Sequence, residues 1–341
     1  MSTAIVILNW NGEKYLQKFL PVLIENTAIP GVEIIVADNA STDSSLSILK
    51  ESFPTVRTLA FDKNYGFAGG YNKALAQVET DYFVLLNSDV EVTPHWLEPL
   101  LAYMEAHEEI AACQPKILSY AQRSNFEHAG AAGGYIDRFG FPFCRGRVLG
   151  LAETDNGQYD SIVDVFWATG ACLMIRSSLY RKVGGLDDEF FAHMEEIDLC
   201  WRLKSRGYRI VCIPESSVFH VGGGALGYES PHKTYLNFRN NLLMLYKNLP
   251  NNLLDKTMFW RSAFDYMAAF QFFITGQTAN AKSVLKARRD FKKIQPLFEE
   301  KRKQNILFAT SDNKTDILQK SIVLEYYLKG HKTYQSLTTK D

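Results

Sequence analysis

The chain carries the sequence YFVLL at residues 82–86, followed directly by NSDVEV at residues 87–92. Five apolar residues that favour extended structure predict a buried strand, and the polarity changes abruptly at its carboxyl end. In an open α/β sheet, this end of a strand is where ligands bind. The carboxylate of Asp89, beside the side-chain oxygens of Asn87 and Ser88, is a candidate ligand for a hard divalent cation that holds nucleotide phosphates. The alternative is that Asp89 caps the helix that follows.

The first hundred residues alternate between short apolar segments and longer amphipathic ones. Strands are expected at 4–8, 33–37, 56–61 and 82–86, and helices at 13–25, 43–52, 68–78 and 94–106. This βαβα alternation predicts a mostly parallel, doubly wound α/β sheet. A chain of 341 residues can bury one large core or two smaller ones.

The rest of the chain changes character twice. Gly-rich turns mark residues 110–225, which we expect to form the acceptor half of the same domain, and beyond about residue 230 the pattern is helical and more basic. Strands are expected at 164–175 and 209–213, and helices at 197–206, 235–249 and 253–275. We therefore expect a catalytic domain over residues 1–228 and a C-terminal helical region over residues 229–341.

Composition excludes several classes of protein. A formal net charge of -1 argues against general nucleic-acid binding. Charged residues interrupt every apolar run before it reaches the roughly 20 residues of a membrane span, and the N-terminus lacks the charged region of a signal peptide. We expect a cytoplasmic protein. The 5 cysteines are odd in number and show no CxxC spacing, so we expect reduced, buried thiols without a metal or disulfide role.

The ends of the first two expected strands carry candidate nucleotide contacts. The first strand runs into NWNG at residues 9–12, which is neither the GxGxxG of a dinucleotide-binding turn nor a P-loop. Trp10 could stack on a base, and Asp38, after the second strand, could accept the imide N–H of uracil or thymine. The alternatives are core packing for Trp10 and a local turn at Asp38.

The third strand end is rich in glycine. It reads NYGFAGGYN at residues 64–72, where glycines allow the backbone to approach a ligand at the start of a helix. Polar contact groups therefore follow three strands along one edge of the expected sheet. A structural role could explain the polar groups at any one of these strand ends, but it explains their presence at all three less well.

A second acidic group lies far along the chain, in FFAHMEEIDLCWR at residues 190–202. Glu195, Glu196 and Asp198 stand at the expected start of a helix, where the helix dipole favours carboxylates. A purely structural role is the alternative, including an ion pair between Asp198 and Arg202. Mutual repulsion raises the pKa of at least one of three such carboxyl groups, which suits a general base.

His220 follows the last expected strand and precedes a run of three glycines at residues 222–224. A neutral imidazole at this place could complete the metal site begun by Asp89. A lone histidine more often has a structural role, which is the alternative.

Taken in order, these motifs resemble the family 2 glycosyltransferases of the GT-A fold, within them the bacterial rhamnosyl- and galactofuranosyl-transferase-like branch. The resemblance covers about residues 3–225. It depends on the ordered motifs ILNWNG, VADNASTD, NYGFAGGYN, NSDVEV as a form of the DxD motif, FFAHMEEIDLCWR and FHVGGG. It implies a Rossmann-like, mostly parallel sheet with a C-terminal helical extension, and an inverting, metal-dependent hexosyltransferase.

The resemblance also implies roles for single residues. Leu8, Trp10 and Asp38 would line the nucleobase pocket, and Gly66 and Asn72 would approach the ribose, diphosphate or sugar. Asn87 and Ser88, beside Asp89, are further candidates for binding the nucleotide sugar. Asp89 would be the main ligand of Mg²⁺ or Mn²⁺, with His220 as the second. The family's acidic motif usually reads Glu-Asp with Asp as the base, and this chain has Glu196 at that position. Glu195 and Asp198 remain alternatives for the base.

The expected reaction is sugar transfer in cell-surface polysaccharide synthesis. The donor would be dTDP-rhamnose or a UDP-sugar, and the acceptor a glycan or a polyprenyl-diphosphate-linked sugar. Two rival functions stay open. A sugar nucleotidyltransferase should carry a Gly-rich, Arg-containing loop after the first strand, which residues 8–12 do not provide. A non-catalytic sugar-binding protein would not need a metal-bearing strand end paired with a distant acidic helix.

The helical tail carries a concentrated positive charge. Residues 282–303 include 9 Lys or Arg against 3 acidic residues, and aromatic segments at 258–260 and 270–273 lie nearby. Such a surface could rest peripherally on the anionic inner face of the cell membrane, which would suit a lipid-linked acceptor. A solvated basic helix or a homodimer interface are the alternatives.

Overall fold

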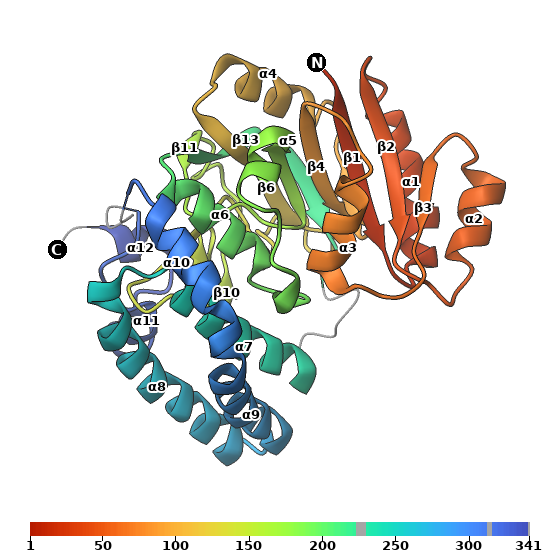
Figure 1. Ribbon diagram of the computed structural model, residues 1–341. Helices are drawn as coiled ribbons and strands as arrows, with labels where there is room; N and C mark the ends of the chain where they lie inside the picture. The colour runs from red at the N-terminus through yellow and green to blue at the C-terminus, as the bar shows by residue number, and fades with distance from the viewer. Residues whose placement is uncertain (223–229, 312–315, 340–341) are drawn as a thin grey trace.

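The computed structural model describes residues 1–222, 230–311 and 316–339. Its centre is a nine-stranded sheet with the order β11-β13-β6-β12-β4-β1-β2-β3, in which β5 pairs with β13 (Figure 1). The sheet contains β1 (Thr3–Asn9), β2 (Val32–Asp38), β3 (Arg57–Ala60), β4 (Tyr82–Asn87), β5 (Val90–Val92), β6 (Ile110–Ser119), β11 (Val163–Asp164), β12 (Cys172–Arg176) and β13 (Arg209–His220). Strands β3, β2, β1 and β4 run parallel to one another, and β6 runs parallel to β13, whereas β12 is antiparallel to both β4 and β6.

Helices cover both faces of this sheet, as the βαβα pattern predicts. One face packs on α1 (Glu13–Glu25), α2 (Ser45–Ser52) and α4 (Glu98–Ala106), and the other on α3 (Gly66–Leu75), α5 (Ser177–Lys182) and α6 (Glu195–Ser205). Successive residues of β4 alternate between the two cores, with Phe83 and Leu85 on one side and Val84 and Leu86 on the other. Burial on both faces explains why this strand is apolar throughout.

A smaller sheet and a helical tail complete the structure. The four-stranded sheet consists of β7 (Gly134–Ile136), β8 (Pro142–Cys144), β9 (Arg147–Val148) and β10 (Leu151–Ala152). The tail consists of α7 (Pro231–Asn248), α8 (Asn251–Ile274), α9 (Thr278–Ile294), α10 (Glu299–Phe308), α11 (Ile322–Leu328) and α12 (Tyr334–Thr338), with a 3-10 turn at Gln295–Phe298 (η2). Another 3-10 turn, Asp188–Phe190 (η1), lies before α6 in the sheet domain.

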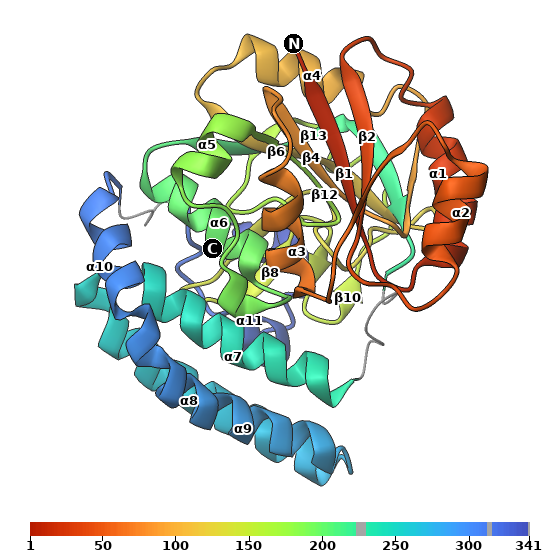
Figure 2. The same ribbon diagram turned by 45° about the vertical axis from the view of Figure 1, so that its right-hand side comes forward.

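The tail packs on the sheet domain. The buried residues 242–245 of α7 belong to the same core as α3 and α6, and Ile322 and Leu337 close a small core with the second sheet. Figure 2 shows α7 below the sheet, on the side to which β1 runs, with α8 and α9 beyond it. The expected domain boundary at residues 228 and 229 lies outside the described residues. Within the described part of the chain, no helix is both long and apolar enough to cross a membrane.

Several sequence predictions are corrected by the structure. The strand expected at 164–175 is wrong, because a loop separates β11 from β12, and in it the Thr169 hydroxyl accepts a hydrogen bond from the Ala171 N–H at 3.2 Å. Strand β13 continues to His220, past an irregularity between Ile213 and Ser217 next to a proline. Neither β6 nor the second sheet was expected. All 5 cysteines are free and buried, as predicted.

Candidate active site

The metal-site candidates Asp89 and His220 lie side by side. Strand β5 places Val90 opposite His220, and the Val221 N–H donates to the Asp89 carbonyl at 3.0 Å. The Nε2 atom of His220 lies 3.1 Å from Oδ1 of Asp89 and 3.4 Å from Nδ2 of Asn87. The fold therefore joins two side chains that the sequence separates by 131 positions.

A third side chain orients this pair. The Nδ1 atom of His220 lies 3.1 Å from Oε2 of Glu127. Burial opposes the charge of the imidazole, but Asp89 and Glu127 outweigh it and raise the pKa of His220 to about 10. Burial likewise opposes the charge of Glu127, and His220 lowers the pKa of this carboxyl to about 2. Metal-binding histidines are commonly held in this way by a carboxylate on their second nitrogen.

The donor atoms here fit a divalent cation bound together with a nucleotide. Mg²⁺ and Mn²⁺ accept a carboxylate oxygen, and Mn²⁺ also accepts an imidazole nitrogen. Asp89 and His220 would be the two protein ligands, and the cation would displace the proton that the imidazole carries in its absence. Among residues 1–222, 230–311 and 316–339 no group of three or more His, Cys, Asp or Glu side chains could hold a metal. A cation between Asp89 and His220 would thus also need oxygen ligands from substrate or water.

The loop before the acidic helix has an unusual backbone. Phe191, His193 and Met194 have φ angles of 63°, 70° and 76°. Non-glycine residues rarely adopt this left-handed region, and such strain concentrates at functional sites. The Phe191 carbonyl accepts hydrogen bonds from the N–H groups of Phe67 and Ala68, at the start of α3, at 2.6 and 3.2 Å.

Helix α7 holds the same loop from the other side. The buried Asn240 side chain donates from Nδ2 to the carbonyl oxygens of Phe190, Ala192 and His193 at 2.9, 2.8 and 2.7 Å. Three acceptors share the two hydrogens of one amide group. Asn240 thus connects the C-terminal helices directly to the residues that precede Glu195.

The three acidic residues of α6 have different surroundings. Glu195 and Glu196 each have an Oε2 atom that is buried and makes no hydrogen bond within the described residues. Burial raises the pKa of Glu196 to about 7, and burial together with the charge of Glu196 raises the pKa of Glu195 well above its ordinary value.

Asp198, by contrast, is fully paired. Its carboxylate accepts hydrogen bonds from Arg202 Nε, Lys247 Nζ and Asn248 Nδ2 at 2.9, 2.9 and 2.7 Å. Burial opposes its charge, but Lys247 and Arg202 lower the pKa of Asp198. The structural alternative for Asp198 is thus realised, while Glu196 keeps an oxygen without a partner and a pKa raised to about 7.

The short loop before β12 lies between the acidic helix α6 and strand β4, after which Asp89 follows. The Cβ atom of Glu196 lies 4.0 Å from the position that a Cβ would take at Gly170. The next residue, Ala171, accepts a hydrogen bond from the Asn87 N–H at 3.0 Å through its carbonyl oxygen. Glu196 and Asp89 therefore lie on the same edge of the sheet, separated by this loop.

The nucleobase candidates lie at the ends of β1 and β2. Trp10 is 43% exposed, so the core-packing alternative does not hold and its ring is free to stack. Asp38 is fully buried and accepts hydrogen bonds from Asn9 Nδ2 at 3.0 Å and from the Ser41 N–H at 2.9 Å. The local turn considered for Asp38 is thus present. A base could contact this carboxylate only if neighbouring side chains moved.

Close packing joins the strand ends. Leu8 lies 2.7 Å from the position that a Cβ would take at Gly70, so the third strand end packs directly on β1. A Cβ at Gly12 would approach Asn9 Oδ1 to 2.3 Å and Ser88 Oγ to 3.4 Å. Ser88 thus faces the loop after β1.

Gly66 and Asn72 contact the protein itself. Gly66 has a φ of 72°, and a Cβ there would lie 2.4 Å from the Phe191 ring. Asn72 donates to the Leu186 carbonyl at 2.8 Å and accepts from the Tyr180 hydroxyl and the Leu186 N–H at 2.6 and 3.1 Å. A contact between Asn72 and a substrate would replace one of these bonds.

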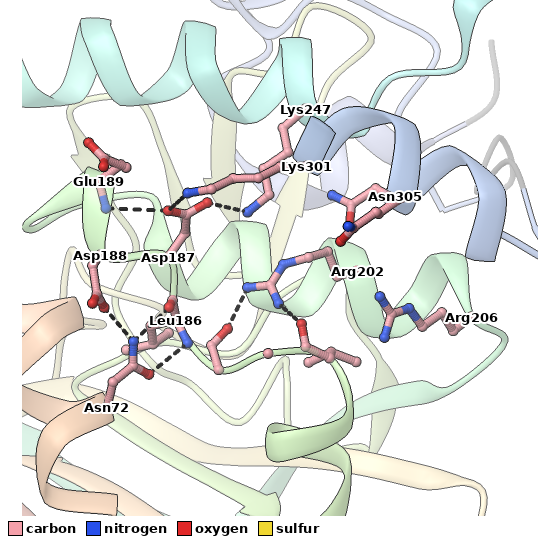
Figure 3. A pocket seen from close by; sticks show the side chains of 14 residues that line it. Asn72, Leu186, Asp187, Asp188, Glu189, Arg202, Arg206, Lys247, Lys301 and Asn305 are labelled. Atoms are coloured by element: carbon pink, nitrogen blue, oxygen red, sulfur yellow. Dashed lines mark hydrogen bonds and ion pairs between the residues drawn. The ribbon is translucent and has the colours of Figure 1, made fainter. Parts of the chain in front are cut away.

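Asn72 also lines a polar cavity of about 440 Å³ (Figure 3). In it Lys247 and Lys301 converge on the two oxygens of Asp187 at 2.6 Å each. The residues that line the cavity do not include Asp89, Glu196 or His220. The paired charges of Lys247, Lys301 and Asp187 join α7 and α10 to the loop before η1.

Two of the residues that shape this site were not predicted. Glu127 lies between expected elements, within RSNFEHAGAAGG at residues 123–134, and no pattern in this stretch marks it. Asn240 lies in a helix interior, where asparagine is unfavourable because its amide competes with the backbone. An asparagine within a predicted helix was therefore the one sign in the sequence that Asn240 has a special role.

Comparison with known proteins identifies one family. The model of the family described as "Glycosyl transferase family 2" matches residues 4–184. The match includes the ends of β1 to β4 and the loop at Gly170.

Three relatives are 25% to 28% identical to this chain over the aligned segments. An N-acetylglucosaminyl-diphospho-decaprenol L-rhamnosyltransferase of Mycobacterium tuberculosis is 28% identical over 231 residues, which cover 63% of this chain and 75% of the relative. The rhamnosyltransferase WbbL of Escherichia coli K12 is also 28% identical, with 63% and 82% covered. The hexosyltransferase Agl10 of Haloferax volcanii is 25% identical, with 70% and 74% covered.

Solved structures share the architecture at lower identity. GalNAc-T7 with UDP, GalNAc and Mn²⁺ superposes with a TM-score of 0.59 at 15% identity, covering 90% of this chain and 57% of that one. TarS residues 1–349 of S. aureus in complex with UDP-GlcNAc gives a TM-score of 0.57 at 15% identity, with 97% and 92% covered.

Proposed function

The chain belongs to glycosyltransferase family 2 and has the GT-A fold, and on this premise we propose that it is an inverting transferase in which Glu196 is the general base. The donor would be a nucleoside-diphosphate sugar. The acceptor would be a hydroxyl group of a glycan or of a lipid-linked sugar. The relatives named as rhamnosyltransferases support dTDP-rhamnose as a donor, and the likeness to TarS with UDP-GlcNAc leaves a UDP-sugar as the other choice.

Glu195 also has a free Oε2 atom, so the observation that carries this proposal is the free Oε2 atom of Glu196 together with its place beside the loop at Gly170. The atom is buried without a partner, and the group's pKa of about 7 leaves much of it ready to accept a proton near neutrality. The loop at Gly170 places Glu196 on the same sheet edge as Asp89. With the general base and the diphosphate site on one edge of the sheet, an acceptor hydroxyl could attack a donor sugar held between them.

The reaction would proceed as a single displacement. Glu196 takes the proton from the acceptor hydroxyl as that oxygen forms a bond to the anomeric carbon of the donor. The bond between this carbon and the diphosphate oxygen breaks at the same time, and the nucleoside diphosphate leaves from the opposite face. Attack opposite to the leaving group inverts the anomeric configuration.

Asp89 and His220 would hold Mg²⁺ or Mn²⁺ at the diphosphate. When bound, this ion would act as a Lewis acid that stabilises the negative charge on the leaving group. Glu127 would keep the imidazole of His220 oriented toward Asp89. Trp10 would stack on the base, with Asp38 and Leu8 beneath the loops that frame it.

The first experiment identifies the donor. We expect a dTDP- or UDP-sugar to raise the melting temperature of the protein in the presence of Mn²⁺, because a ligand of the folded state stabilises it. The same mixture should release nucleoside diphosphate once an acceptor is added, and EDTA should abolish the release. A product with the anomeric configuration of the donor would contradict the single displacement.

A further inference from the structure

Helix α8 presents an uncovered apolar face to solvent. The exposed side chains on this face are Phe259, Trp260, Met267, Phe270, Phe273 and Ile274, with exposed fractions between 45% and 69%. They recur at spacings of three, four and seven residues, so they share one side of the helix. The opposite side is buried, and there the Phe264 ring packs on the rings of Phe139 and Phe141 at centroid distances of 5.2 and 5.6 Å. Contiguous apolar patches of this kind mark interaction sites.

The neighbouring helix α9 exposes positive charge. Lys282, Lys286, Arg289, Lys292 and Lys293 are all exposed, while Val284, Ala287 and Phe291 are buried. The sole acidic residue of α9 is Asp290, which accepts a hydrogen bond from the Tyr235 hydroxyl and lies 3.8 Å from both Lys286 and Lys293. The helix therefore keeps a clear surplus of positive charge at its surface.

The two helices form one hairpin at the edge of the molecule. Helix α9 packs on both α7 and α8. Figures 1 and 2 both show α8 and α9 as the outermost layer beyond α7, on the side to which β1 runs. This is the side of the candidate active site, because β1 and β4 are parallel and end there.

We propose that the α8–α9 hairpin docks on an anionic membrane surface. The aromatic and aliphatic side chains of α8 enter the interface, and the cations of α9 contact anionic lipid headgroups. The positive charge of α9 favours an anionic membrane over a second copy of the chain as the partner of this surface. A second copy of the chain would bring two surplus positive surfaces together, whereas an anionic lipid surface neutralises them. Docking in this orientation turns the active-site edge toward a lipid-linked acceptor. That last consequence depends on the proposed function, whereas the docking itself does not.

Vesicle flotation of the full chain, without donor or acceptor, tests the proposal. We expect binding to vesicles that contain phosphatidylglycerol, weaker binding to pure phosphatidylcholine vesicles, and a decrease as salt is raised. The double variant Arg289→Gln and Lys292→Gln should lower the partition coefficient by about 25-fold, because each cation near an anionic surface contributes roughly fivefold. The double variant Phe270→Ser and Phe273→Ser should lower it by at least about tenfold.

A matched control uses another exposed apolar pair. Tyr327 and Leu328 of α11 are 63% and 78% exposed, so Tyr327→Ser with Leu328→Ser removes a similar exposed area elsewhere. This control should bind vesicles like the wild type. Equal binding by the wild type and the α8 variant would overturn the proposal. A second result would also overturn it: the wild type sediments as a dimer, the double variant Phe270→Ser and Phe273→Ser sediments as a monomer, and neither protein binds vesicles. In that case a second copy of the chain, and not a membrane, would cover α8. Because these readouts need no catalysis, an inactive protein that still binds vesicles would contradict only the proposed function.

Discussion

At the scale of single residues, the acidic helix start shows how position within one turn decides the chemistry of a carboxylate. Asp198 is surrounded by three donors and stays ionised. Glu196, two positions earlier, has an oxygen without a donor and a pKa of about 7. The difference follows from which side of α6 faces Lys247 on α7.

The pH dependence of the reaction follows from this pKa. Only the deprotonated form of Glu196 can act as a base, so kcat/KM should fall about tenfold per pH unit below pH 7 and level off above it. The residual activity of Glu196→Gln should show no such decline, since a glutamine does not titrate. A wild-type profile that stays flat through pH 7 would place the base elsewhere.

Measurements of Mn²⁺ binding test the metal-site residues Asp89 and Glu127. Asp89→Ala should weaken Mn²⁺ binding, measured by calorimetry in the presence of the nucleoside diphosphate, by about 10²-fold or more, because it removes a direct ligand. Glu127→Gln should weaken it by about 10- to 100-fold, because the imidazole of His220 loses the carboxylate that orients it. Glu91→Gln is the matched control, since that carboxylate pairs with Arg123 at the surface. Unchanged affinity in Asp89→Ala would exclude it as a ligand.

At the scale of elements, α7 acts on the acidic loop through Asn240. Asn240→Ala removes the amide that holds three carbonyl groups, so we expect kcat to fall by about 10²-fold while the donor affinity stays unchanged. Asn240→Asp should be at least as damaging, because a carboxylate has no hydrogen to donate to carbonyl oxygens.

The control for this prediction is another buried asparagine of the tail. Asn280 on α9 bonds to Thr234 and Gln277 and lies outside the loop. Asn280→Ala should lower stability and leave kcat unchanged. If Asn240→Ala and Asn280→Ala had the same small effect on kcat, the positioning role of Asn240 would be wrong.

The first four strands and their helices could be predicted because their signals are local. Helix α1 was expected at residues 13–25 and is found at Glu13–Glu25, since its apolar residues recur at helical spacing. The second half of the sheet could not be predicted in the same way. Strand β12 has five residues and lies between two antiparallel neighbours, an order that depends on pairing between distant segments.

In the candidate site, too, features with a local signal could be predicted and features that depend on distant segments could not. The sequence indicated which strand ends carry carboxylates, and Asp89 and His220 are indeed neighbours. It gave no sign that Glu127 would reach His220 or that Phe191 would adopt a left-handed backbone. Both depend on packing between segments that the sequence keeps far apart.

At the scale of the whole molecule, a buried ion cluster joins the tail to the sheet domain. Lys247 on α7 contacts both Asp187 and Asp198, and its side chain is 5% exposed. Burial opposes the charge of Asp187, but Lys247 and Lys301 outweigh it and hold the pKa of this carboxyl at about 2. Because this value is below the roughly 3.9 of an unfolded aspartate, the stabilisation by Asp187 is complete only above about pH 4 and is lost as the pH falls through 2.

Lys247→Met should therefore destabilise the whole molecule. It leaves two buried carboxylates without their shared cation, so we expect the free energy of unfolding at pH 7 to fall by about 3–5 kcal/mol in urea titrations. The matched variant Lys301→Met removes a cation whose side chain is 38% exposed, and it should cost less than about 1 kcal/mol. Equal losses in the two variants would show that burial does not decide the effect.

The most direct measurement of the central claim is the single-turnover rate of Glu196→Gln, together with its donor affinity, once the donor and acceptor are known. We predict a rate about 10²- to 10⁴-fold below that of the wild type and an unchanged dissociation constant for the donor, because only the proton acceptor is lost. Glu195→Gln, with the same change one residue earlier, should retain most of the activity. Wild-type turnover in Glu196→Gln, with the loss appearing in Glu195→Gln instead, would contradict the account.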